Sequence, residues 1–406
     1  MIKLKYLLVL ADGMADYPVP ELNGKTPLQV SKKPNMDYLA QNGEVGLVRN
    51  IPPGMPPGSD VANLAVMGYN PRQYYTGRSP LEAMSIGVEM APTDVSFRCN
   101  LVTLSDAPSI DERIMVDYSA GEITSQEAEL LIKDLAKALN STDINLFPGI
   151  SYRHLMVWHN APSKYRLTPP HDISDRPIGA YLPQDESGIL LELIKESWSI
   201  LENHPVNQKR KNKGLNPANS IWFWGEGRKP NITDFTEKYG LKGSVISAVD
   251  LAKGLGIAAG LKMISVPGAT GNIHTNFKGK AQAALDAFKA GDDFVYLHIE
   301  APDEAGHQGD LPTKIRAIER IDAEVIALIL AELPKIAADF KLLLLPDHPT
   351  PLTLKTHVAD PVPFVIYQPG KNNVKGSTGV FDESAAKTTG INIEEGYRLM
   401  DHFIKK

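Results

Sequence analysis

The sequence predicts an α/β protein with a doubly wound sheet, into which a smaller α+β domain is inserted. Three short apolar runs end at Leu10, Ile299 and Leu345. They lack the alternation of a half-exposed strand and therefore indicate strands that are buried on both faces. Helical patterns at 280–290 and 315–331 flank the second and third runs. Strands that alternate with helices form parallel sheets covered by helices.

Length and composition divide the chain into two expected domains. At 406 residues it is longer than one compact core usually permits. Segments between 93 and 239 are shorter and more polar than the rest, and prolines such as Pro177 and Pro183 interrupt them. We therefore expect residues 93–239 to form the inserted domain, and residues 1–92 and 240–406 to form the α/β domain.

The composition argues against several classes of partner. The net charge of −6 gives no reason to expect nucleic acid or an anionic membrane surface. No apolar run approaches the ~20 residues that span a bilayer. The single cysteine, Cys99, excludes an intramolecular disulfide and fits a reducing compartment. We expect a cytoplasmic protein, and its oligomeric state stays open.

An aspartate follows each of the three apolar runs, as Asp12, Asp303 and Asp347. Ligands of a doubly wound sheet bind at the carboxyl ends of its strands. His307 comes four residues after Asp303, across a segment that we expect to form a turn, and His348 directly follows Asp347. Segments far apart in the sequence are thus expected to bring carboxylates and imidazoles to one edge of one sheet.

His357, nine residues after His348, completes a predicted metal site. Mixed Asp and His ligands suit Zn²⁺ or Mn²⁺ and, less well, Mg²⁺. Two such ions about 4 Å apart hold the attacking and leaving oxygens in phosphoryl transfer. Each residue alone is typical of a turn, a helix cap or a surface histidine, so the prediction depends on the joint pattern. Metal ions with a purely structural role are the non-enzymatic alternative.

Ser59 is the candidate nucleophile. It precedes residues 61–67, a short helical segment closed by Gly68, so an ordinary N-cap is one interpretation. The other is a serine that accepts a phosphoryl group, because the free N–H groups and the dipole of a helix N-terminus favour a phosphate there. The sequence shows no general base beside Ser59, so this interpretation requires activation by a metal ion.

Six short motifs, spread along nearly the whole chain, are informative as a set. They are Ala11-Asp12-Gly13-Met14 and the segments 56–63 (PPGSDVAN), 75–83 (YTGRSPLEA), 97–101 (FRCNL), 268–271 (GATG) and 301–307 (APDEAGH). Together they resemble the archaeal-type cofactor-independent phosphoglycerate mutases of the alkaline phosphatase superfamily. The resemblance implies an alkaline phosphatase-like domain that binds metal ions and an inserted domain that grips the substrate.

The resemblance also implies which residues hold two divalent metal ions. One ion would be bound by Asp303, His307 and His357. The other would be bound by Asp12, Ser59, Asp347 and His348. Ser59 would accept the phosphoryl group as a phosphoserine and return it to a different hydroxyl of the bound glycerate.

In the inserted domain, the resemblance implies a set of residues that grips the phosphate and carboxylate of the substrate. They are Arg98, Asn100, Arg153 and His154. Guanidinium groups suit this work because they bind both anions through paired hydrogen bonds. Surface ion pairs are the alternative role for these side chains.

One segment departs from the family pattern. Archaeal-type mutases typically have Arg-Gly-Ala-Gly near the end of the inserted domain, where this chain has Phe223-Trp224-Gly225-Glu226-Gly227. Trp224 stands where a cation is expected, and Glu226 adds a negative charge nearby. The segment is similar to that of a proposed homoserine kinase-like subgroup.

The leading hypothesis is an isomerase that interconverts 3-phosphoglycerate and 2-phosphoglycerate in glycolysis and gluconeogenesis without bisphosphoglycerate. The alternatives are phosphotransfer to homoserine in threonine biosynthesis and hydrolysis of phosphomonoesters. No G-x-x-x-x-G-K-[ST] loop is present, so a nucleotide donor would have to use the two metal ions.

Overall fold

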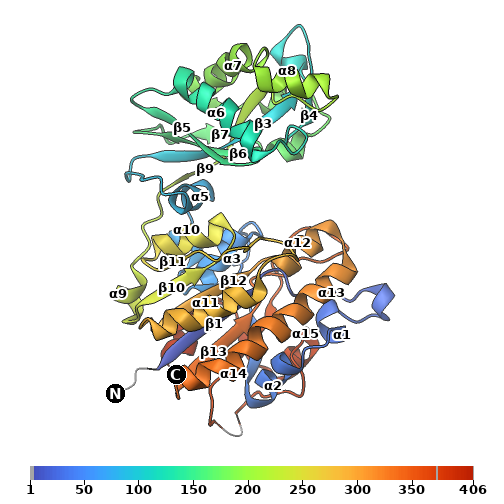
Figure 1. Ribbon diagram of the computed structural model, residues 1–406, viewed down its shortest axis with the longest axis vertical. Helices are drawn as coiled ribbons and strands as arrows, with labels where there is room; N and C mark the ends of the chain where they lie inside the picture. The colour runs from blue at the N-terminus through green and yellow to red at the C-terminus, as the bar shows by residue number, and fades with distance from the viewer. Residues whose placement is uncertain (1–3, 372–373, 406) are drawn as a thin grey trace. The chain divides into compact units, whose positions relative to one another are not determined.

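The computed structural model describes residues 4–371 and 374–405, and the chain divides into two compact units. Unit 1 comprises Met1–Tyr75 with Asn231–Lys406, and unit 2 is the insert Thr76–Pro230. Figure 1 shows the elements of each unit.

The insert has earlier bounds than the predicted 93–239. It begins earlier because α5 (Ser79–Ser85) packs on strands of unit 2. It ends earlier because α9 (Phe235–Tyr239) packs on unit 1, where the rings of Phe235 and Phe294 stack with 4.4 Å between their centres. Both helices are short, so their packing partners and not their sequences decide to which unit they belong.

Unit 1 is built on an eight-stranded sheet. In spatial order its strands are β11 (Lys262–Ile264), β10 (Gly243–Ile246), β12 (Phe294–Ile299), β1 (Lys5–Ala11), β13 (Phe340–Leu345), β14 (Val362–Tyr367), β2 (Gly43–Val48) and β15 (Asn392–Ile393). The first five are mutually parallel, and β14 runs antiparallel to both of its neighbours.

Helices cover both faces of this sheet, as the sequence predicts. The helices of unit 1 besides α9 are the short 3-10 helix η1 (Pro20–Leu22), α1 (Pro27–Val30), α2 (Pro34–Asn42), α3 (Ser59–Val66), α4 (Pro71–Tyr74), α10 (Asp250–Ala258), α11 (Phe277–Lys289), α12 (Ala301–Gln308), α13 (Leu311–Arg320), the π-helix η5 (Ile321–Ile326), α14 (Ala327–Ile336), α15 (Glu383–Thr388) and α16 (Arg398–Lys405). Leu7 and Val9 of β1 share a buried cluster with residues of α11 and α14. Tyr6, on the other face, contacts Phe403 of α16 edge-on, with 5.5 Å between ring centres. The fold is therefore a doubly wound α/β sheet.

The register around β1 aligns the three predicted strand ends. β1 lies between β12 and β13, with Ala11 opposite Ile299 and Leu10 opposite Leu345. The chain therefore leaves all three strands at the same edge of the sheet, immediately before Asp12, Glu300 and Pro346.

Unit 2 is an antiparallel sheet with its long helices on one face and α5 on the other. Its strands are β3 (Val95–Leu104), β4 (Met115–Asp117), β5 (Ile144–Ile150), β6 (Arg153–Trp158) and β9 (Ser220–Arg228), with the separate pair β7 (Tyr165–Arg166) and β8 (Gln184–Asp185). Its long helices are α6 (Ser125–Leu139), α7 (Ile189–Leu201) and α8 (Pro205–Asn212). Phe97 and Cys99 of β3 share a core with Leu131 of α6 and Ile194 of α7. This is the α+β insert that the sequence predicts.

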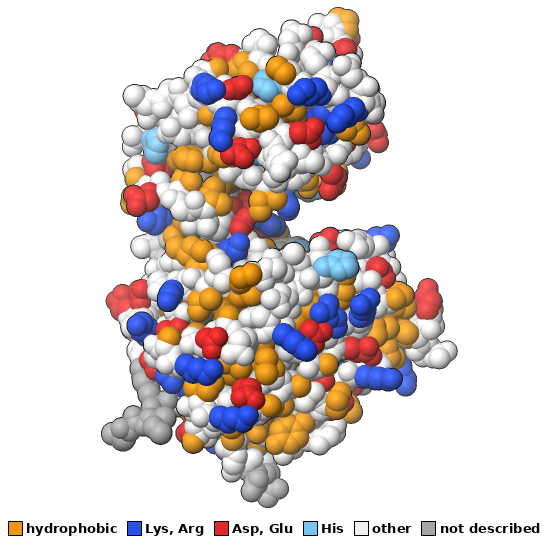
Figure 2. Space-filling model, viewed as in Figure 1, with side chains coloured by type: hydrophobic (Ala, Val, Ile, Leu, Met, Phe, Trp, Pro, Cys, Tyr) orange, Lys and Arg blue, Asp and Glu red, His pale blue; other side chains and the backbone are white. Residues whose placement is uncertain are grey.

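The surface agrees with the modest net charge. In the face shown in Figure 2, lysine and arginine side chains are interspersed with aspartate and glutamate over both units. Among residues 4–371 and 374–405, no helix combines the length and the apolar character that a membrane crossing requires.

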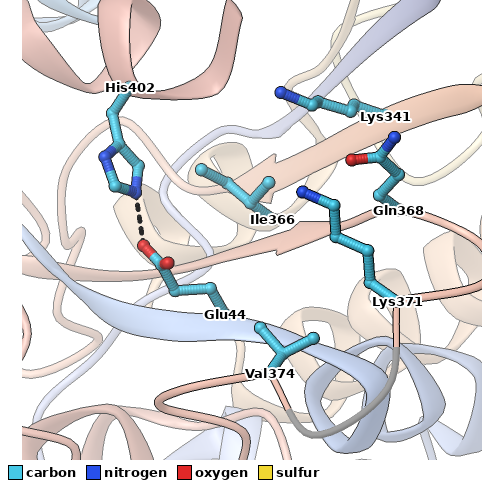
Figure 3. Close-up of a pocket in the computed structure, with 7 residues that line it drawn as sticks. All are labelled: Glu44, Lys341, Ile366, Gln368, Lys371, Val374 and His402. Carbon is cyan, nitrogen blue, oxygen red and sulfur yellow. Dashed lines mark hydrogen bonds and ion pairs between the residues drawn. The ribbon is translucent and has the colours of Figure 1, made fainter. Parts of the chain in front are cut away.

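A small cavity lies at the edge of the unit 1 sheet opposite the three strand ends. It has a volume of about 160 Å³ and is lined by Glu44, Lys341, Ile366, Gln368, Lys371, Val374 and His402. Figure 3 shows the Glu44 carboxylate in contact with the His402 ring at its margin. Lys341 is the second residue of β13, so most of the length of that strand separates this cavity from Asp347.

Candidate active site

All seven predicted metal-binding residues lie in unit 1, at the carboxyl edge of its parallel strands. Asp12 follows β1, Asp347 and His348 follow β13, and His357 lies in the loop that comes next. Asp303 and His307 lie on α12, a helix where the sequence predicted a turn. Residues four apart on a helix share one face, so α12 presents both side chains together.

Asp303, His307 and His357 form one compact group. The Asp303 carboxylate lies 3.3 Å from His307 Nε2 and 3.4 Å from His357 Nε2. The two Nε2 atoms are 2.8 Å apart. His307 Nδ1 lies 3.0 Å from the carbonyl oxygen of Lys355 and donates to it, so Nε2 is the ring nitrogen that faces the carboxylate. Three donor atoms thus converge on one point.

Asp12, Ser59, Asp347 and His348 form the second group. His348 Nε2 lies 3.0 Å from Ser59 Oγ, 3.3 Å from Asp347 Oδ2 and 3.7 Å from Asp12 Oδ1. Asp12 Oδ1 is buried and has no hydrogen-bond partner among the described residues. A buried carboxylate oxygen without a partner is costly, so this group favours an additional cation.

The electrostatics of the two groups also favour a cation. Burial, together with repulsion from Asp347 and Asp303, raises the pKa of Asp12 well above its usual range. Burial opposes ionisation of Asp303 as well, but hydrogen bonds from His307 and His357 lower the pKa of Asp303. The hydrogen bond with Asp303 raises the pKa of His307 to about 9. A protonated His307 therefore balances the negative charge of Asp303, whereas no protonated side chain among the described residues balances Asp12 in the same way. Divalent cations fit both donor sets.

Ser59 is not a helix cap. Gly58 occupies the N-cap position, and Ser59 is the first residue of α3. Its hydroxyl instead contacts His348 Nε2. The sequence showed no basic group beside Ser59, because His348 approaches from a segment 289 positions away in the chain.

A glycine and an asparagine support these groups. Gly13 has a φ of +60°, and a Cβ atom there would lie 2.6 Å from the Cα of Asp303. Only glycine therefore allows the turn after Asp12 to approach α12 so closely. Asn63, which sequence reasoning missed, donates from Nδ2 to Asp347 Oδ2 at 2.9 Å and to the Ser59 carbonyl at 2.8 Å. Its spacing of four residues from Ser59 on a helix was the available signal.

Thr350 and His298 were also missed. The Thr350 hydroxyl contacts both Asp303 Oδ1 and His348 Nδ1, one member of each group. His298 contacts Asp12 from within β12. Both residues support predicted ligands without having a motif of their own.

In unit 2, three of the four predicted substrate residues share one face of the sheet. Arg98 and Asn100 are two residues apart on β3, and Arg153 on β6 lies directly opposite Asn100, so all three point to the same side. His154 points to the other side, because it is adjacent to Arg153 and lies opposite the buried Cys99. His154 Nδ1 accepts a hydrogen bond from the Gly149 N–H, and burial lowers the pKa of His154 to about 3.

Arg98 is held from two directions. Its Nε lies 3.0 Å from Glu82 Oε2, and its guanidinium carbon lies 4.3 Å from the centre of the Trp224 ring. Trp224 Nε1 donates to Asn100 Oδ1 at 2.9 Å. Burial alone raises the pKa of Glu82, but attraction to Arg98 and Arg78 lowers it overall. Trp224 therefore lies against a cation, and Glu226 lines a different hollow with Lys164, Tyr165 and Arg228.

Comparisons with known proteins agree with this architecture. Residues 40–207 match the family described as 2,3-bisphosphoglycerate-independent phosphoglycerate mutase. A probable mutase of that name from Geobacter sulfurreducens is 49% identical over 99% of this chain and 100% of its own length. The mutase from Methanosarcina barkeri is 47% identical, again over 99% of this chain and 100% of its own length.

Two solved structures extend the comparison. A protein from Pyrococcus horikoshii superposes with a TM-score of 0.83 at 31% identity, covering 100% of this chain and 97% of that one. A cofactor-independent phosphoglycerate mutase from Thermoplasma acidophilum has a TM-score of 0.67 at 27% identity, covering 100% and 99%. Identity near one half over the full length shows that the chain belongs to the 2,3-bisphosphoglycerate-independent phosphoglycerate mutase family.

Proposed function

We propose that the chain interconverts 3-phosphoglycerate and 2-phosphoglycerate through a phosphoserine at Ser59, with two divalent metal ions. The observation that carries the proposal is the convergence on His348 Nε2 of Ser59 Oγ at 3.0 Å, Asp347 Oδ2 at 3.3 Å and Asp12 Oδ1 at 3.7 Å. A hydroxyl at a helix N-terminus among metal-ligating side chains is the arrangement that a phosphoryl-accepting serine needs.

The two ligand sets are Asp303 with His307 and His357, and Asp12 with Ser59, Asp347 and His348. Histidine nitrogens among the donors favour Mn²⁺ or Zn²⁺ over Mg²⁺. Two ions bound to these sets would place positive charge against the phosphoryl oxygens and favour the ionised form of the Ser59 hydroxyl.

The reaction then uses Ser59 twice. Ser59 Oγ forms a bond to phosphorus while the bond from phosphorus to the glycerate oxygen breaks, and that oxygen takes up the serine proton. In the second step the other glycerate hydroxyl attacks the phosphoserine, and its proton returns to Ser59. No water is consumed, so the site has to exclude water while the phosphoserine exists.

Arg98, Asn100 and Arg153 suit the binding of the glycerate carboxylate. Glu82 fixes one edge of the Arg98 guanidinium and Trp224 covers one of its faces, so it is held in a single orientation. A preorganised guanidinium loses little entropy when it binds a carboxylate. His154 faces the core of unit 2, and we propose a packing role for it.

Homoserine is the weaker substrate on this geometry. The tryptophan that replaces the expected cation lies against Arg98, so this face of unit 2 keeps its positive charge. Glu226, which would attract an ammonium group, lies beside Lys164 and Arg228 in another hollow. The arginine face therefore favours the carboxylate of a phosphoglycerate.

The test is a substrate comparison with purified protein loaded with Mn²⁺. Incubation with 3-phosphoglycerate, followed by ³¹P NMR, is expected to show 2-phosphoglycerate and negligible inorganic phosphate. Release of phosphate without 2-phosphoglycerate would favour hydrolysis. Phosphorylation of homoserine from ATP, with no mutase product, would replace the proposal by the homoserine alternative.

A further inference from the structure

We propose that His298 is a positioning residue that holds Asp12 by one carboxylate oxygen and leaves the other oxygen for the metal ion. The inference rests on the proposed function, because it assumes that Asp12 is a ligand. His298 is the fifth residue of β12, a neighbour of β1 in the sheet. Its side chain is 1% exposed.

The hydrogen bonds around His298 define which ring nitrogen carries the proton. Ser247 Oγ accepts a hydrogen bond from the Val249 N–H at 2.9 Å and lies 3.0 Å from His298 Nδ1. The Ser247 hydroxyl proton can go to Nδ1 or to the Val249 carbonyl oxygen at 3.4 Å. An ionised Asp12 carboxylate beside Nε2 can only accept, so Nε2 donates and Nδ1 is the acceptor. Since a neutral imidazole carries one proton, that proton is on Nε2, which lies 2.9 Å from Asp12 Oδ2.

The backbone of His298 is held as well. Lys280 Nζ donates to the His298 carbonyl at 3.1 Å. The ring is thus a single-proton donor that is fixed at both nitrogens and at its backbone.

The two oxygens of the Asp12 carboxylate therefore have different roles. Oδ2 accepts from His298, and Oδ1 is buried without a hydrogen-bond partner among the described residues. Oδ1 is also the oxygen nearer to His348 Nε2, at 3.7 Å. The free oxygen is therefore the one that belongs to the group around Ser59.

A different role for His298 has to be considered, because ligand atoms of Asp12, His298 and Glu300 lie within 4.8 Å of one another. A third ion there would need a lone pair on His298 Nε2, which the hydrogen-bond pattern gives a proton. It would also lie near the ammonium group of Lys280, which interacts with Glu300. Both features oppose a third cation, so we infer a donor role for His298.

The experiment is a calorimetric titration of the metal-free protein with Mn²⁺. The wild type is expected to bind two ions. His298→Leu should lower the affinity for the ion at Asp12 by about 10- to 100-fold, the usual loss when a group that orients a metal-binding residue is removed. His298→Gln, whose amide nitrogen can take the place of Nε2–H, should restore affinity to within a few-fold. The ion at Asp303 should stay unchanged in both variants.

His307→Gln is the matched comparison, since it should weaken the other ion and spare the one at Asp12. If His298→Leu does not fold, as judged by circular dichroism, Ser247→Ala tests the same chain of hydrogen bonds and should weaken the Asp12 ion by about fivefold.

The outcomes separate the inference from the proposed function. A wild type that binds no ion would overturn the proposed function. Two ions in the wild type, with unchanged affinity in His298→Leu, would overturn the inference alone. Equal weakening of both ions would indicate a general structural role and overturn it as well. Three ions in the wild type and two in His298→Leu would make His298 a ligand, which also contradicts the inference.

Discussion

The Asp/His groups of unit 1 and the arginine face of unit 2 handle charge in opposite ways. In unit 1, Asp12 and Asp347 are buried near each other, and Asp12 Oδ1 lacks a partner among the described residues. In unit 2, Arg98 is also buried and its Nε makes no well-aligned hydrogen bond among the described residues, but the Glu82 carboxylate 3.0 Å away and the Trp224 ring compensate its charge. The first region is incomplete without an added cation, whereas the second is preformed. Removal of the bound cations should therefore disturb the structure of unit 1 and leave unit 2 unchanged.

Removal of divalent metal gives the largest expected contrast. Chelation should abolish the interconversion and increase hydrogen exchange around residues 12–16, 303–307 and 347–357, with little change in unit 2. Rebinding at 100 times Kd should add about 2.7 kcal/mol of stability per ion. Hydrogen-exchange mass spectrometry of metal-loaded and chelated protein measures the local change in exchange. Equal changes in both units would contradict the contrast between a cation-dependent unit 1 and a preformed unit 2.

Ser59→Ala comes next. Loss of the proposed nucleophile should lower kcat by roughly 10³-fold or more, with the fold intact by circular dichroism. Ser199→Ala is the matched control, because that serine is exposed on α7 in unit 2. Substantial activity in Ser59→Ala would remove this residue from the mechanism.

Arg98→Lys tests the preformed region. Lysine keeps the charge but loses the planar group that Glu82 and Trp224 hold, so KM should rise about 10- to 100-fold, the value of one or two charge-assisted hydrogen bonds. Metal affinity should not change. Arg113→Lys is the control, since Arg113 also lies over a tryptophan of unit 2, 4.1 Å from the centre of the Trp198 ring. Similar KM changes in both variants would argue against a specific role for Arg98.

The smallest expected effect concerns a carboxyl group of unit 1 that takes up a proton instead of a cation. Glu383 accepts from the Asp16 N–H and the Thr26 hydroxyl, and burial raises the pKa of Glu383 to about 7. The unfolded chain ionises near 4.3, so the stabilisation is complete below that pH and is lost as pH rises towards 7.

Glu383→Gln should remove this dependence. Its Tm relative to wild type should therefore increase between pH 5 and pH 8, as measured by thermal unfolding. Glu332→Gln, at a half-exposed site that pairs with Lys335, should show a constant difference across that range. A constant difference for Glu383→Gln too would contradict the raised pKa.

The sequence predicts that these aspartate and histidine side chains lie together, because strand ends are visible in it. Asp12 and Asp347 follow apolar runs whose carboxyl ends meet at one edge in the observed register. His298 was hidden for the same reason. It lies inside a run that was interpreted as buried strand, and nothing local distinguishes a histidine that supports a ligand from one that packs.

The prediction of substrate-binding residues in unit 2 could have been refined from the sequence. Arg153 and His154 are adjacent in a strand, and adjacent strand residues face opposite sides, so they could not both face a substrate. Partners such as Glu82 and Trp224 for Arg98 depend on contacts between distant segments, which a single sequence does not encode locally.

The central position of β1 has a consequence for synthesis. Residues 5–11 pair with 294–299 on one side and 340–345 on the other, while unit 2 is a continuous stretch of chain. At a synthesis rate of about 5–20 residues per second, roughly 15 to 60 s pass between the synthesis of β1 and that of β12, its first partner strand. Unit 2 is complete well before then. A nascent chain halted between residues 231 and 290 should therefore carry a protease-resistant insert next to an apolar amino-terminal segment that chaperones have to shield.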